Sequence, residues 1–139
     1  MRENWGTWLG WLGIALGGAL GSVCRYAVQG LVQGTLPGLF PFGTLAVNLA
    51  GSLIIGALAA LFEAFGGSPS ALQARLFLMV GVLGGFTTFS SFSLENLNLL
   101  RTGDWRTALL YVLSSNVGGL LLAFAGYGLC RALVVRSLA

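Results

Sequence analysis

The sequence has 139 residues, of which 56% are hydrophobic and only 8% are charged, and its formal net charge is +3. An ordinary soluble domain carries roughly a quarter charged residues, so this composition argues against a water-exposed globular protein. It also argues against an enzyme, because the absence of histidine removes the commonest general base and zinc ligand. Seven scattered arginines are too few for a nucleic-acid surface.

A helix needs about 20 apolar residues to cross a lipid bilayer. Four charge-poor stretches reach that length, and short loops with Gly, Pro or charged residues separate them. We therefore predict a single all-α transmembrane domain over 1–139, with spans at about 8–32, 42–65, 72–100 and 105–134. Four short helices enclose too little interior for a pore, so we also expect an oligomer.

The third predicted span changes character between Gly84 and Ser93. Paired glycines are followed there by β-branched and hydroxyl residues, which are poor helix formers. We predict that this helix is broken near its middle. Carbonyl groups freed inside a membrane are usually matched by a cation or by water, so two copies crossing near Gly84 to Thr87 could surround one structural ion.

Arginines are almost evenly divided between the two sides of the predicted four-span arrangement. One side has Arg2, Arg75, Arg131 and Arg136, and the other has Arg25, Arg101 and Arg106. The positive-inside rule needs a clear excess to set an orientation. We therefore predict insertion in both orientations and an antiparallel homodimer, the alternative being that one dominant arginine biases insertion.

Neutral polar residues are concentrated inside the predicted spans. They are Asn48, Thr87, Thr88, Ser90, Ser91, Ser93, Ser114, Ser115 and Asn116. Each one alone is explained by ordinary hydrogen bonding between helices. As a cluster interleaved with phenylalanines, they indicate a pathway for a permeating species. Neutral hydrogen-bond donors suit a small anion, because they hold it weakly enough for it to leave again.

Phe89 and Phe92 are three residues apart, so on a helical turn they share a face. The edge of an aromatic ring carries partial positive charge and can contact an anion without binding it tightly. Two packed core aromatics are an equally good interpretation of this spacing.

Three motifs together resemble the Fluc, or CrcB, family of fluoride channels over essentially the whole chain. They are Gly17–Gly21 followed by Arg25-Tyr26, Gly43–Leu45 with Val47-Asn48 and Gly51-Ser52, and Gly84–Phe92. The resemblance implies an antiparallel homodimer with two pores that exports cytoplasmic fluoride passively through the inner (plasma) membrane. It also implies a central structural sodium ion that is not transported.

The resemblance further assigns roles to individual residues. Phe89 and Phe92 match the phenylalanines beside the fluoride path, Asn48 the pore asparagine, and Ser90 and Ser91 part of a hydroxyl track, to which we add Ser114 and Ser115. Backbone oxygens of Gly84 and Thr87 match the sodium ligands, and Arg25 and Glu95 fall near the pore mouth. The alternatives are a small dual-topology multidrug or cation exporter and a non-transporting membrane scaffold protein.

Overall fold

The computed structural model describes the backbone of residues 8–138 and the side chains of residues 8–136. These residues form helices and no strand. The helices are α1 (Trp8–Thr35), α2 (Phe42–Phe65), α3 (Pro69–Arg75), the π-helix η1 (Leu76–Leu83), α4 (Gly84–Phe86), α5 (Phe89–Arg101) and α6 (Trp105–Leu138). Arg2, which entered the predicted arginine balance, lies outside the described residues.

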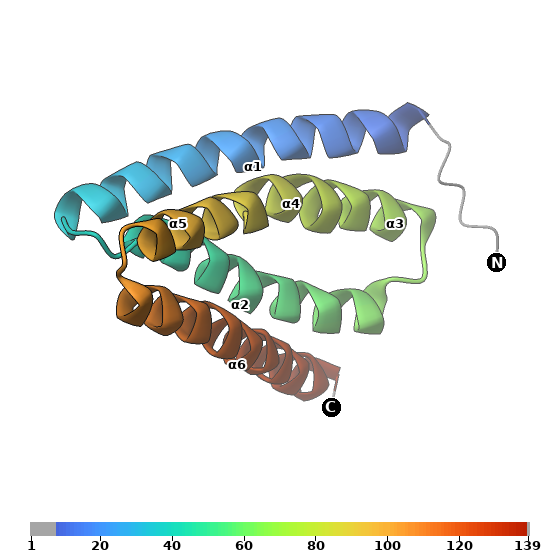
Figure 1. Cartoon of the computed structure of the whole chain (residues 1–139). Helices are drawn as coiled ribbons and strands as arrows, with labels where there is room; N and C mark the ends of the chain where they lie inside the picture. The colour runs from blue at the N-terminus through green and yellow to red at the C-terminus, as the bar shows by residue number, and fades with distance from the viewer. Residues whose placement is uncertain (1–7, 139) are drawn as a thin grey trace.

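Four helical stretches are long and apolar enough to cross a membrane, which confirms the prediction of a multi-pass helical membrane protein. They are Trp8–Thr35, Phe42–Phe65, Pro69–Arg101 and Trp105–Arg136, the third combining α3, η1, α4 and α5. Figure 1 shows that successive spans run in opposite directions, so that α1 begins and α6 ends at the same end of the molecule.

α1 packs against the third span through glycines, which let the two backbones approach closely. A Cβ atom added to Gly17 would lie 2.6 Å from the carbonyl oxygen of Phe77 and 3.0 Å from the Cα of Gly81. One turn later, a Cβ on Gly21 would overlap the carbonyl oxygen of Val82. In lipid, such close packing replaces the hydrophobic effect as the force that holds helices together.

α2 and α6 pack in the same way. A Cβ on Gly56 would overlap the carbonyl oxygen of Ala123, and a Cβ on Gly126 would overlap that of Leu53. Near the ends of both helices the Tyr127 hydroxyl donates to Glu63 Oε2 at 2.6 Å. Glycines therefore allow close backbone approach in both helix pairs.

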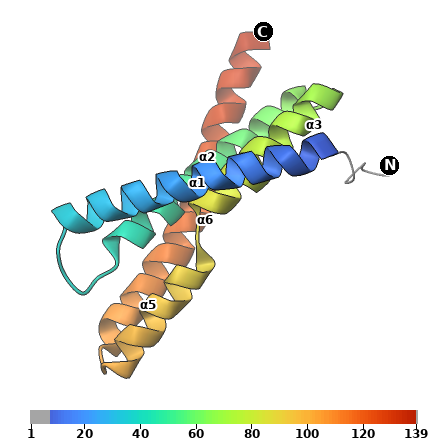
Figure 2. The ribbon, with the colours of Figure 1, turned by 90° about the horizontal axis from the view of Figure 1, so that it is seen from above.

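The third span has two extended residues, Thr87 and Thr88, between α4 and α5. Their φ and ψ angles are −84° and 157° for Thr87 and −149° and 117° for Thr88. Figure 2 shows that α5 leaves the line of α4 and runs beside the first half of α6. There Leu99, Ala108 and Tyr111 form a small buried cluster.

Candidate functional site

The Asn48 side chain on α2 holds the extended segment at Thr88. Asn48 Nδ2 donates to the Thr88 carbonyl oxygen at 3.1 Å, and the Thr88 N–H donates to Asn48 Oδ1 at 2.8 Å. In an uninterrupted α-helix the Thr88 N–H would donate to the carbonyl of Gly84, four residues earlier. Asn48 therefore takes the ordinary helical donor away from the Gly84 oxygen.

The Thr88 side chain has the same effect on Thr87. Thr88 Oγ1 accepts from the Ser91 N–H at 3.1 Å and so caps the start of α5. An uninterrupted helix would direct that N–H to the carbonyl of Thr87. The two carbonyl groups predicted to hold an ion, those of Gly84 and Thr87, have thus both lost their usual donors to side chains.

Gly84 and Thr87 line a cavity of about 350 Å³ together with Asn48 and Phe89. Backbone carbonyl oxygens in such positions suit an alkali cation, which needs oxygen ligands in place of its hydration shell. The residues present therefore fit a sodium ion held by Gly84 and Thr87.

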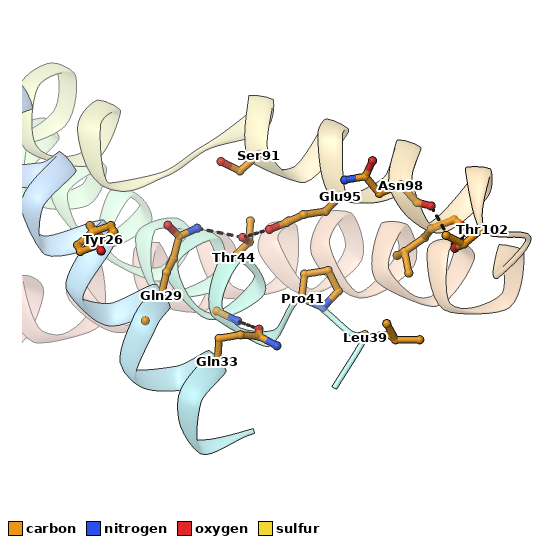
Figure 3. A pocket seen from close by; sticks show the side chains of 13 residues that line it. Tyr26, Gln29, Gln33, Leu39, Pro41, Thr44, Ser91, Glu95, Asn98 and Thr102 are labelled. Carbon is orange, nitrogen blue, oxygen red and sulfur yellow. Dashed lines mark hydrogen bonds between the residues drawn. The ribbon is translucent and has the colours of Figure 1, made fainter. Parts of the chain in front are cut away.

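A second cavity, of about 630 Å³, lies between α1, α2 and α5 and contains Glu95. Figure 3 shows Gln29 from α1, Thr44 from α2 and Glu95 from α5 joined across it. Thr44 Oγ1 donates to Glu95 Oε1 at 2.6 Å, and the Tyr111 hydroxyl donates to Glu95 Oε2 at 2.7 Å. Thr44 and Tyr111 are 3% and 0% exposed, so both donors approach the carboxylate from the protein interior.

A row of aromatic rings connects the two cavities. Phe89, which lines the smaller one, is 77% exposed, and its ring centroid lies 5.6 Å from that of Phe92. The Phe92 centroid lies 5.1 Å from that of Tyr111, whose hydroxyl binds Glu95 at the larger cavity. Phe89 and Phe92 are therefore adjacent in space, as their spacing predicted.

The hydroxyls beside this row differ in what they bind. Thr88 Oγ1 donates to Ser91 Oγ at 3.1 Å and lies 3.3 Å from Ser90 Oγ, within hydrogen-bond distance. Ser114 Oγ donates to its own helix, at the Leu110 carbonyl, 2.7 Å away. Ser115 Oγ is buried and has no partner among the described residues, so its hydroxyl is available to a ligand or to water.

The remaining predicted residues lie farther from these contacts. Asn116 is exposed and donates to the Val112 carbonyl of its own helix at 2.8 Å. Arg25 is half-buried on α1, one turn before Gln29.

Sequence reasoning did not single out Thr44, Tyr111 or Gln29. A usable signal was present, because a carboxylate such as Glu95 within a long apolar span requires donors from neighbouring helices. Sequence alone does not say which donors these are. The geometry brings three spans and the α5 segment together around one carboxylate and a row of rings.

The fold and site define a multi-spanning helical membrane protein. A row of polar and aromatic side chains, called the seam below, runs between its apolar helices and consists of Gln29, Thr44, Asn48, Phe89, Phe92, Glu95 and Tyr111. The family described as CrcB-like protein, Camphor Resistance (CrcB), matches residues 12–127. The chain belongs to this family.

Curated relatives support the same placement and are named as ion channels rather than enzymes. A protein of Thermus thermophilus is 55% identical over 87% of this chain and 94% of its own length. A protein of Opitutus terrae is 58% identical over 70% of this chain and 74% of its own length. One of Parabacteroides distasonis is 45% identical over 81% of this chain and 86% of its own length. Each is named fluoride-specific ion channel FluC.

Proposed function

We propose that this protein is a fluoride-selective passive channel that exports fluoride from the cytoplasm. The observation that carries the proposal is the pair of buried hydroxyls, on Thr44 and Tyr111, that converge on Glu95 inside a membrane-spanning region. The names of the relatives, which cover most of the chain, support fluoride as the ion.

The chemistry of the site suits a small anion with high charge density. Fluoride leaves water only if strong hydrogen-bond donors replace its hydration shell, and hydroxyl donors do so without adding a fixed positive charge. Thr44 and Tyr111 already donate to a negative oxygen, so each needs only to redirect its proton from Glu95 to the ion. Because fluoride must compete with the carboxylate for these donors, it is held weakly enough to leave, as conduction requires.

Other residues of the seam extend the path on both sides. The free hydroxyl of Ser115 lies one turn beyond Tyr111 on α6, and the rings of Phe92 and Phe89 continue toward the smaller cavity. Their ring edges offer partial positive charge to the passing anion. Asn48, Ser90, Ser91 and Ser114 supply further polar groups, and Arg25 attracts anions to the pore mouth.

The channel is completed by a second copy in the opposite orientation, which gives an antiparallel homodimer with two pores. The exposed ring of Phe89 and the exposed position of Gly84 support this, since a lone protomer leaves both residues uncovered. A sodium ion at the centre would be held by the carbonyl oxygens of Gly84 and Thr87 from both chains. When bound it supplies fixed positive charge and joins the two protomers, and it is not transported.

The protein then acts in the inner (plasma) membrane without an energy source of its own. A negative interior drives an anion outward with about 2.3 kcal/mol per 100 mV. A passive path is therefore sufficient to lower cytoplasmic fluoride.

Ion efflux from liposomes tests this proposal. Purified protein is reconstituted into vesicles loaded with potassium fluoride or potassium chloride, and release is started with valinomycin. We expect rapid fluoride release and chloride release no faster than from protein-free vesicles. Equal release of both anions, release of neither, or proton-coupled uptake of an organic cation instead would each overturn the proposal.

A further inference from the structure

Two glutamines on α1, one turn apart, contact the first turn of α2 in different ways. Gln29 Nε2 donates to the Thr44 hydroxyl oxygen at 2.9 Å. Gln33 instead holds the backbone: its Oε1 accepts from the Gly43 N–H at 3.1 Å, and its Nε2 donates to the carbonyls of Gly38 and Phe40 at 3.3 Å each. Figure 3 shows both side chains pointing from α1 toward α2.

Gln33 takes the place of a missing helix cap. The residue that precedes α2 is Pro41, which offers no side-chain acceptor, so the N–H groups of the first turn need another partner. Gln33 provides one and ties the loop between α1 and α2 to the same point. The position of α2 along α1 is also fixed by contact, since a Cβ on Gly43 would lie 2.6 Å from the Gln29 carbonyl oxygen.

Gln29 is therefore not required to hold α2 in place, and its amide contacts only the Thr44 hydroxyl in this cluster. A threonine hydroxyl has one proton to donate and two lone pairs that accept. Thr44 sends its proton to Glu95, a carboxylate that only accepts, and Gln29 fills an acceptor site on the same oxygen. The three side chains form a directed chain from Gln29 to Thr44 to Glu95.

These two contacts favour the Thr44 rotamer in which Oγ1 reaches both Gln29 and Glu95. Inside a helix, a threonine side chain has two accessible rotamers, and one of them donates its proton to a carbonyl one turn back. In that rotamer the proton no longer points into the space between α2 and α5. The Gln29 N–H makes the other rotamer more favourable, because it is satisfied only when the Thr44 oxygen faces α1.

We propose that Gln29 is a positioning residue for anion conduction, which keeps the Thr44 hydroxyl proton directed at the anion-binding position beside Glu95. This inference rests on the proposed channel function and assigns to the amide of Gln29 a role in the rate of fluoride passage. Gln29 does not bind the ion itself.

The test uses the variants Gln29→Met, Thr44→Val and the double variant in fluoride efflux from liposomes. Methionine keeps the length of the side chain and removes the donor. We expect Gln29→Met to lower the efflux rate about fivefold, as the loss of one typical hydrogen bond predicts. In the Thr44→Val background, where no hydroxyl remains to be positioned, the same substitution should cause no further loss.

Gln33→Met is the matched comparison, because it removes backbone contacts and should reduce efflux by the same factor with or without the Thr44 hydroxyl. Wild-type efflux from Gln29→Met, or losses that multiply in the double variant, would overturn the inference while leaving the channel function intact. Absence of fluoride efflux from the wild-type protein would instead overturn the channel function.

Infrared spectroscopy gives a second measurement that does not depend on flux. The carboxylate stretching band of Glu95 is identified by its loss in Glu95→Gln. We expect Gln29→Met to shift this band as Thr44 turns away, and Gln33→Met to leave it in place. An unshifted band in Gln29→Met would contradict the positioning role.

Discussion

The polar residues of the spans differ in whether they form hydrogen bonds within their own helix or with another part of the chain. Ser114 and Asn116 donate to carbonyls one turn earlier in their own helix, which satisfies them inside hydrocarbon. Thr44, Tyr111 and Asn48 instead reach across to other helices. We expect a hydroxyl that bridges two helices to exchange its partner for an ion more readily than one bound within its own turn.

Removing the Tyr111 hydroxyl tests this distinction. Tyr111→Phe keeps the ring contacts with Phe40 and Phe92 but leaves Glu95 Oε2 without a donor. We expect fluoride efflux from liposomes to fall by a factor of between about 5 and about 150, the effect of a desolvation cost of about 1–3 kcal/mol at the half-buried carboxylate. The variant should elute at the same volume as the wild type in size-exclusion chromatography.

Tyr127→Phe is the control for that substitution, since Tyr127 also donates to a glutamate, Glu63, at an exposed position near the other end of α6. We expect wild-type efflux from it. A similar loss in both variants would mean that a tyrosine–glutamate contact anywhere on α6 affects flux through folding alone.

Asn48 acts on one backbone position with both ends of its amide. Asn48→Asp keeps the acceptor for the Thr88 N–H but loses the donor to the Thr88 carbonyl and adds a negative charge. We expect a lower melting temperature in detergent and slower fluoride efflux. The same change at exposed Asn116 should alter neither quantity, and an equal effect at both positions would contradict the role of the paired Asn48 contacts.

At the scale of the helices, the arrangement depends on backbones that nearly touch. Gly17 and Gly21 bring α1 against η1 and α4, while Gly56 and Gly126 bring α2 against α6. These contacts hold the spans around the extended residues of the third one. Side chains at the contacts would push helices apart and move Thr44 away from Glu95.

A substitution in α1 checks this requirement. In Gly21→Ala the new Cβ would overlap the Val82 carbonyl oxygen and lie 2.9 Å from the Phe86 N atom, and neither backbone atom can move aside easily. We expect a lower melting temperature in detergent and slower fluoride efflux from liposomes.

Gly30→Ala, on the same helix, meets no atom within 4 Å and should leave stability unchanged or raise it slightly. Equal stability of Gly21→Ala and the wild type would show that α1 docks without this close approach.

At the scale of the whole molecule, arginines of the described residues are balanced between the two membrane faces. Arg75, Arg131 and Arg136 belong to the face where α1 begins and α6 ends, and Arg101 and Arg106 flank the turn at the opposite face. Arg25 lies in the half of α1 nearer that opposite face. Such a balance leaves the orientation undecided, which the proposed antiparallel pair requires.

A protein with arginines added to one face should therefore give little fluoride efflux alone. Co-expression with a protein that carries added arginines on the other face should restore efflux. Gly67→Arg with Ser70→Arg adds two positive charges to one face, and Gly34→Arg with Leu36→Arg adds two to the other. We expect each biased protein alone to give little fluoride efflux and their co-expression to recover most of it. Full efflux from either biased protein alone would contradict the antiparallel homodimer.

The sequence by itself determined the class of protein and its family. Composition and span length require lipid as the solvent, whatever the packing, and the glycine, asparagine and Thr-Thr-Phe-Ser motifs identify the CrcB family. It also marked Asn48 as a polar side chain inside an apolar span, which needs a partner there. Glu95 entered only through the family resemblance, as a residue near the pore mouth.

Only the tertiary structure decided which partners these are. Asn48 and Thr88 are 40 residues apart, Thr44 and Glu95 are 51 apart, and Tyr111 reaches Glu95 from another helix. The rotation and depth of each helix set these contacts, and both follow from where glycines allow backbones to approach. Periodicity shows which residues share a face of one helix, but it does not show which face of another helix lies opposite.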